Sequence, residues 1–214
     1  GPEIGVASTK AFSTQLAGLM LLVLSLAKSK ELNPLLRKRV VTALRLLPDS
    51  INESFKLKEQ IKAIADDIAK KDNSLFLGRG IFYPVAKEGA LKLKEISYIH
   101  AEAYPAGELK HGPLALIDEN MPTIALAPES EIAEKLISNL EEVKARGGYL
   151  YVFGSKKIKM NIKNGSLLEM PECDFLVSPI VYSIPLQILA YEVALVRGTD
   201  IDQPRNLAKS VTVE

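Results

Sequence analysis

Four short apolar runs that alternate with helical patterns constrain the fold more than any other feature of the chain. The runs are 74–80, 121–128, 148–154 and 166–171, and amphipathic or apolar helical patterns follow the first, the second and the fourth of them. Strands that alternate with helices form a parallel sheet covered on both faces, and right-handed crossovers make that sheet doubly wound. The sequence therefore predicts an α/β fold with its ligand rim at the carboxyl ends of the strands, where Gly78, Arg79 and Gly80 lie.

The segment 8–28 predicts a helix whose second half is apolar on most sides, with Ser8 or Thr9 as its N-cap. Its apolar run, Leu16 to Ala27, is too short to span a bilayer and has no basic segment before it. A helix this apolar needs cover on several faces, and no sheet precedes it in this sequence. We expect that the missing cover comes from a segment upstream of Gly1.

The region between this helix and the first strand predicts two further helices. A break at 29–34 ends with Pro34, which is suited to open a short basic helix at 35–46. Ser50 and Glu53 then have the spacing of a capping box, which predicts a new helix running to about Lys71.

Charge and sulfur content exclude several classes of function. The formal net charge is +1, which gives no reason to expect nucleic acid or an anionic membrane as a partner. Two histidines and one cysteine are too few for a zinc site, so the sequence predicts no metal and no cofactor. Cys173 is expected to be a small core residue, and a chain without disulfides fits a cytoplasmic protein.

Three ionisable residues of the predicted helix 84–99 have spacings of four and three. Glu88, Lys92 and Glu95 therefore project from about the same face of that helix. One interpretation is a solvated face with surface ion pairs. The other is a carboxylate held beside an ammonium in a cleft, which is the pairing that proton transfer requires.

The segment 100–117 has neither a helical nor a strand pattern and is punctuated by proline and glycine, which is typical of functional loops. It carries both histidines, and His111 lies in its tight Gly-rich turn, which favours His111 over His100 as a catalytic group. Lys209 lies in the polar tail, and its own surroundings predict an ordinary solvated lysine. Residue patterns alone thus lead to a sugar- or nucleotide-binding α/β domain of undefined chemistry.

Three long stretches together resemble one family. Residues 1–19, 88–118 and 202–214 closely resemble the isomerase half of the glutamine–fructose-6-phosphate aminotransferases, and the weaker likeness between them is loosest at 155–175. That family is built from two sugar isomerase (SIS) lobes, each a flavodoxin-like αβα sandwich, followed by a tail. The resemblance implies that residues 1–31 end a first lobe, 32–199 form linker helices and the second lobe, and 200–214 form a catalytic tail.

The resemblance also implies roles for individual residues. Lys209 would form an imine with the carbonyl carbon of fructose 6-phosphate, which an amine can do only when it is unprotonated. Glu95 would move a proton between the first two sugar carbons, and Lys92 would hold Glu95 or handle hydroxyl protons. His111 would assist ring opening from a neighbouring subunit of a homodimer.

Pocket-lining contacts of the family would come from Val6, Ser8 and Ala208. The implied product is glucosamine 6-phosphate, made with ammonia that a glutaminase domain releases from glutamine. That domain is absent here, and so is the upstream Ser/Thr loop that would hold the sugar's phosphate, so we expect this chain alone to bind fructose 6-phosphate poorly. Two alternatives stay open: a non-catalytic SIS module that senses a sugar phosphate, and an isomerase that uses a base without an imine.

Overall fold

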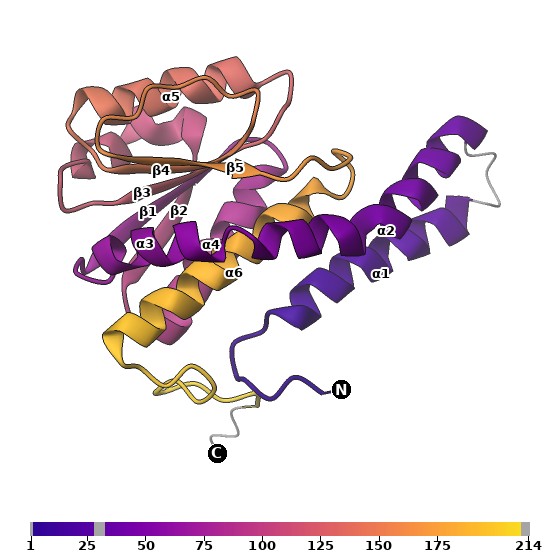
Figure 1. The fold of residues 1–214 in the computed structure, drawn as a ribbon, viewed down its shortest axis with the longest axis horizontal. Coiled ribbons are helices and arrows are strands. Elements are labelled where there is room, and N and C mark those ends of the chain that lie inside the picture. The colour runs from indigo at the N-terminus through magenta and orange to yellow at the C-terminus, as the bar shows by residue number, and fades with distance from the viewer. Residues whose placement is uncertain (1, 28–32, 211–214) are drawn as a thin grey trace.

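The core of the molecule is a five-stranded parallel sheet with the strand order β2-β1-β3-β4-β5 (Figure 1). The computed structural model describes residues 2–27 and 33–210. The strands are β1 (Asn73–Gly78), β2 (His100–Pro105), β3 (Thr123–Ala127), β4 (Leu150–Ser155) and β5 (Gly165–Met170). This order is that of the flavodoxin-like doubly wound sheets, so the predicted fold class is confirmed.

Helices cover both faces of the sheet because side chains alternate along each strand. Phe76, Ile124 and Phe153 point to one face, where they pack with α3 (Lys58–Ile68), α4 (Phe82–Ser97) and α6 (Ser178–Arg197). Leu75, Leu77, Ala125 and Val152 point to the other face, towards α5 (Ala133–Ala145) and the 3₁₀ helix η2 (Ala106–His111). The result is three layers with a separate apolar core on each side of the sheet.

Residues 100–117 are more regular than predicted, and the prediction of an irregular segment is wrong for its first six residues. These residues form β2, which pairs in parallel with β1 from Asn73↔His100 to Gly78↔Pro105. The sequence of β2 has no apolar run because β2 is an edge strand, and among its residues only Ala101 is buried. The remainder consists of η2 and a second short 3₁₀ helix, η3 (Pro113–Leu116).

The two helices that precede β1, which are α2 (Pro34–Phe55) and α3, also differ in part from the prediction. Pro34 does open α2, with Asn33 as its cap. The helix then continues through Pro48, so the predicted capping box is wrong: Ser50 lies inside α2, and its hydroxyl donates to the carbonyl of Leu46. Buried side chains on both sides of Pro48 hold the helix together despite the lost backbone bond, and the break comes only at residues 56–57.

The first helix, α1 (Lys10–Ala27), lies along the side of the molecule with none of its residues buried (Figure 1). Leu19, Val23 and Leu26 are each more than half exposed. In the described part of the chain, α1 and α6 are long and apolar enough to span a membrane by length and composition, and 67% of the α6 window is buried core. The predicted break at 29–34 and the boundary at 31/32 fall almost entirely at 28–32, outside the described residues.

Candidate functional site

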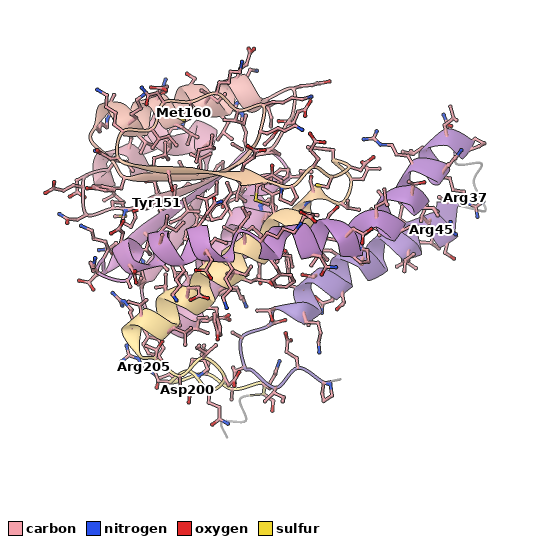
Figure 2. The ribbon with its side chains drawn as sticks, in the orientation of Figure 1. Arg37, Arg45, Tyr151, Met160, Asp200 and Arg205 are labelled. Carbon is pink, nitrogen blue, oxygen red and sulfur yellow. The ribbon has the colours of Figure 1, made fainter. Side chains whose placement is uncertain are left out.

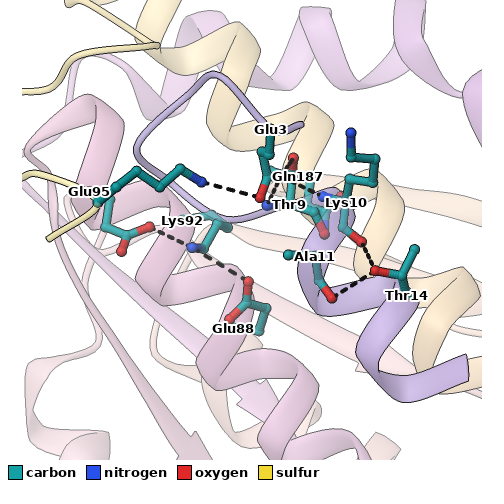
Figure 3. Close-up of polar contacts among 10 residues, drawn as sticks. Glu3, Thr9, Lys10, Ala11, Thr14, Glu88, Lys92, Glu95 and Gln187 are labelled. Carbon is teal, nitrogen blue, oxygen red and sulfur yellow. Dashed lines mark hydrogen bonds and ion pairs between the residues drawn. The ribbon is translucent and has the colours of Figure 1, made fainter. Parts of the chain in front are cut away.

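A buried ammonium between two carboxylates is the most unusual feature of α4. The Nζ of Lys92 lies 2.5 Å from Oε2 of Glu95 and 3.6 Å from Oε1 of Glu88 (Figure 3). The helical spacing puts all three side chains on one face, as predicted. That face is not solvated: the side chain of Lys92 is 3% exposed, that of Glu88 12% and that of Glu95 21%.

The low exposure of this cluster shifts the pKa of one of its carboxyl groups. Burial raises the pKa of the Glu88 carboxyl, the positive charge of Lys92 partly offsets the effect, and the negative charge of Glu95 adds to it. Glu88 also lines a groove of about 600 Å³ beside α4, which Phe12 of α1 and Tyr104 of β2 border. Of the three residues only Glu88 lines this groove, and the two carboxylates with the ammonium between them form a group that can accept and return protons.

The tail after α6 is held against the carboxyl end of α4. The hydroxyl of Thr199 donates to the carbonyl of Ile96, and the backbone N–H of Arg205 donates to the hydroxyl of Tyr98 at 2.9 Å. The guanidinium of Arg205 also lies 4.2 Å from the centre of the Tyr98 ring, a cation–π contact. Tyr98 ends α4 in the left-handed conformation, with φ 62°. The helix that carries the cluster and the tail are therefore joined one turn beyond Glu95.

The same tail contacts the N-terminal segment. The N–H of Val6 donates to the carbonyl of Asp202 at 2.8 Å, and Nζ of Lys209 lies 3.4 Å from Oε2 of Glu3. Figure 2 shows Asp200 and Arg205 on the tail, at the end of the molecule where α6 ends and the N-terminal segment passes. The side chain of Asp200 accepts the N–H groups of Asp202 and Gln203, which shapes the turn.

The start of α1 is capped by a residue that the sequence did not suggest. Oε1 of Glu3 accepts the backbone N–H groups of Thr9 and Lys10 at 2.8 and 2.9 Å, and the hydroxyl of Thr9 at 3.0 Å. Glu3 thus satisfies N–H groups at the helix start, the task predicted for Ser8 or Thr9. Its separation of six residues from Thr9 matches no local capping pattern, so only the folded chain reveals it.

The predicted site residues fall into two groups. One group belongs to segments that meet at one end of the molecule, and it consists of Lys92 and Glu95 on α4, Val6 and Ser8 before α1, and Ala208 and Lys209 in the tail. His111 does not join them. It ends η2 beyond the carboxyl end of β2, its side chain is 71% exposed, and its Nδ1 lies 2.7 Å from Oε2 of Glu108 in the same turn.

The carboxyl rim of the sheet, predicted as the ligand side, holds separate clefts. One cleft of about 660 Å³ lies beyond β3, β4 and β5. At the end of β1, the guanidinium of Arg79 donates to the side-chain oxygen of Asn139. Cys173 borders this cleft of about 660 Å³, and burial, and to a lesser extent Asp174, raise the pKa of its thiol to about 11, as expected for an inert thiol. Among residues 2–27 and 33–210, no three His, Cys, Asp or Glu side chains are grouped to hold a metal ion.

The sheet order and the covered faces define a doubly wound α/β domain with an ionisable cluster on one helix and a tail docked beside it. Residues 67–197, more than half of the chain, match the family model described as the SIS domain. The chain belongs to the SIS domain family.

Two curated relatives extend this assignment. The chain is 58% identical over 215 residues to the glutamine–fructose-6-phosphate aminotransferase (isomerizing) of Idiomarina loihiensis, and 57% identical over 215 residues to that of Escherichia coli strain K12. Each alignment covers 100% of this chain and 35% of the relative. The chain thus corresponds to about a third of these proteins, namely their C-terminal SIS isomerase region.

Solved structures agree with the fold. The C-terminal domain of the glucosamine-fructose-6-phosphate aminotransferase from Francisella tularensis superposes with a TM-score of 0.91 at 48% identity, over 95% of this chain and 58% of that one. A glucosamine-6-phosphate deaminase from Thermotoga maritima superposes with a TM-score of 0.75 at 27% identity, over 100% of this chain and 60% of that one.

Proposed function

We propose that this chain is the isomerase portion of an enzyme that converts fructose 6-phosphate and glutamine-derived ammonia to glucosamine 6-phosphate. The single observation that carries the proposal is the docking of the tail beside the α4 cluster. An amine, Lys209, and a carboxylate paired with a buried ammonium, Glu95 with Lys92, belong to adjoining segments of one chain. The aminotransferases named above support the choice of reaction, because the likeness runs along the whole chain.

The proposed chemistry uses one amine and one base. The neutral amine of Lys209 adds to the carbonyl carbon of the open-chain sugar, a C–N bond forms, and the carbonyl oxygen leaves as water. Ammonia then adds to the imine carbon, the C–N bond to Lys209 breaks, and Lys209 leaves as a free amine, so that the second sugar carbon carries an imine of ammonia. The carboxylate of Glu95 takes a proton from the first sugar carbon and returns it to the second, while the hydroxyl on the first carbon loses its proton and becomes the aldehyde. Lys92 orients Glu95 through the contact of 2.5 Å and balances its charge in a site where water is scarce.

Three further residues complete the proposed pocket. Val6, Ser8 and Ala208 line it through backbone and hydroxyl contacts, and the bond from Val6 to Asp202 already ties two of its walls together. We assign His111 to ring opening in the site of a second copy, which its exposed position on η2 allows. The proposal therefore includes a homodimer.

The proposed enzyme has three segments within this chain and a glutaminase domain in addition to it. We assign residues 1–31 to the end of a first lobe, 32–199 to linker helices and the second lobe, and 200–214 to a catalytic tail. The exposed apolar face of α1 supports the first boundary, because Leu19, Leu22 and Val23 are more than half exposed on a helix that needs apolar cover. A glutaminase domain supplies ammonia, and we place the enzyme in the cytoplasm.

Product formation by the full-length protein tests the proposal. Fructose 6-phosphate and glutamine should give glucosamine 6-phosphate, and Lys209→Arg should abolish it, because a guanidinium cannot form the imine. Glu95→Gln should bind the sugar but lose turnover. If the protein binds fructose 6-phosphate without turning it over, it is a sensing module. If Lys209→Arg keeps its activity, the reaction needs a base and no imine.

A further inference from the structure

Glu3 divides its two carboxylate oxygens between two tasks. Oε1 accepts the three hydrogen bonds from Thr9 and Lys10 that cap α1, and Oε2 faces the amine of Lys209 at 3.4 Å. The side chain of Glu3 is 14% exposed, whereas that of Lys209 is 47% exposed. The fixed partner in this contact is therefore the carboxylate, and the movable one is the lysine.

A fixed negative charge at this point follows from the start of α1. The N-terminus of a helix favours an anion, and a carboxylate that accepts several N–H bonds is held in a single orientation. Burial opposes the charge of Glu3, but the hydrogen bonds from Thr9 and Lys10 and the contact with Lys209 outweigh it and lower the pKa of its carboxyl to about 2. Glu3 is thus a charged, immobile group at neutral pH.

Lys209, in contrast to Glu3, is a flexible side chain in a tail without helix or strand. The side chain has four rotatable bonds, and its ordering costs up to about 2 kcal/mol. The other contacts of the tail involve the hydroxyl of Thr199, the carbonyl of Asp202, and the backbone N–H and guanidinium of Arg205. The ammonium of Lys209 instead contacts Glu3.

We propose that Glu3 is a positioning residue for Lys209, which holds the amine at the start of α1 until the sugar carbonyl arrives. The inference rests on the proposed imine chemistry at Lys209. In the resting state the ammonium pairs with Oε2 of Glu3. After the proton passes to solvent, the neutral amine adds to the carbonyl carbon and water leaves, while Glu3 keeps its proton-free state and its bonds to α1.

The test compares Glu3→Gln and Thr9→Val with the unchanged sequence in the full-length protein. Glutamine keeps a carbonyl oxygen for the N–H groups of Thr9 and Lys10 but offers Lys209 no charge. Valine at position 9 removes one bond to Oε1 and leaves the Glu3–Lys209 contact intact. Each protein is incubated with fructose 6-phosphate and borohydride, and the rate at which Lys209 is modified is followed by peptide mass spectrometry.

We expect Glu3→Gln to slow modification about fivefold, which corresponds to about 1 kcal/mol of the cost of ordering the Lys209 side chain that Glu3 no longer offsets. Its melting temperature and KM for fructose 6-phosphate should stay near those of the unchanged protein, so that the loss appears in kcat. Thr9→Val should modify Lys209 at the normal rate.

Three outcomes overturn parts of the account separately. If Glu3→Gln modifies Lys209 at the normal rate, Glu3 does not position it, and the proposed function stands. If both variants slow modification equally and melt at lower temperature, Glu3 only caps α1. If the unchanged protein makes product without any modification of Lys209, the proposed function fails, and the positioning role fails with it.

Discussion

Replacing Lys92 by methionine should destabilise the protein far more than the loss of a surface ion pair. Methionine has a similar length and is apolar, so the packing around position 92 changes little and the effect is mainly electrostatic. The substitution leaves the carboxylates of Glu88 and Glu95 with side-chain exposures of 12% and 21% and no ammonium between them. Breaking a buried ion pair costs about 3–5 kcal/mol.

The cost here should lie at the low end of that range. Glu95 retains some contact with water, and either carboxylate can take up a proton, so we expect a loss of about 3 kcal/mol in the free energy of unfolding at pH 7. The sign of the pH dependence follows from the same charges. A carboxyl whose pKa is raised in the folded state, as for Glu88, costs stability as pH rises above its ordinary value of 4.5. Without Lys92 this effect grows, so the deficit should shrink when the pH falls from 7 towards 5.

The assay is urea-induced unfolding followed by circular dichroism at both pH values, with Lys94→Met as the matched control. Lys94 lies on the same helix and pairs with Glu102 at 2.6 Å, but its side chain is 44% exposed. The control should cost no more than about 1 kcal/mol. If Lys92→Met costs no more than Lys94→Met, or if its deficit does not depend on pH, the α4 cluster is not electrostatically buried.

Two further predictions concern the supports of the site. The stability that Glu3 contributes should be present above pH 4.5 and lost as pH falls through about 2, since its folded-state pKa is lowered to about 2; a carbon-13 NMR titration with a midpoint above 4 would contradict this. Arg197→Met should cost about 2–3 kcal/mol in urea unfolding, because the guanidinium donates to the carbonyls of Lys71, Ala69 and Ser97 at 2.6, 3.0 and 3.1 Å and so joins the ends of α3 and α4. Arg197→Lys should recover less than half of that loss, since an ammonium cannot span three carbonyls, and full recovery would refute the bridging role.

The strands of the sheet could be predicted where both of their faces are buried. β1, β3 and β4 are continuous apolar runs, because helices cover them on both sides. β2 could not be predicted, since an edge strand with Glu102 and Tyr104 only half covered has no such run, and its pairing with β1 is a tertiary event. The helix through Pro48 was missed for a related reason: its packing outweighs the local capping signal.

The site shows the same division between local and tertiary information. The spacing of Glu88, Lys92 and Glu95 predicts a shared face of a helix, but their burial depends on the segments packed over α4. The contact between Glu3 and Lys209 joins residues 206 positions apart, for which no local pattern exists. Only the likeness of the tail to a known family singles out Lys209.

The central claim is that Lys209 forms the covalent bond to the sugar, and the location of a trapped adduct tests it most directly. The full-length protein is treated with fructose 6-phosphate and borohydride, digested and mapped by mass spectrometry. Our account predicts that the reduced sugar phosphate is attached to Lys209 and that product formation is lost in proportion. An active enzyme whose Lys209 stays unmodified, or an adduct on Lys92 instead, would contradict it.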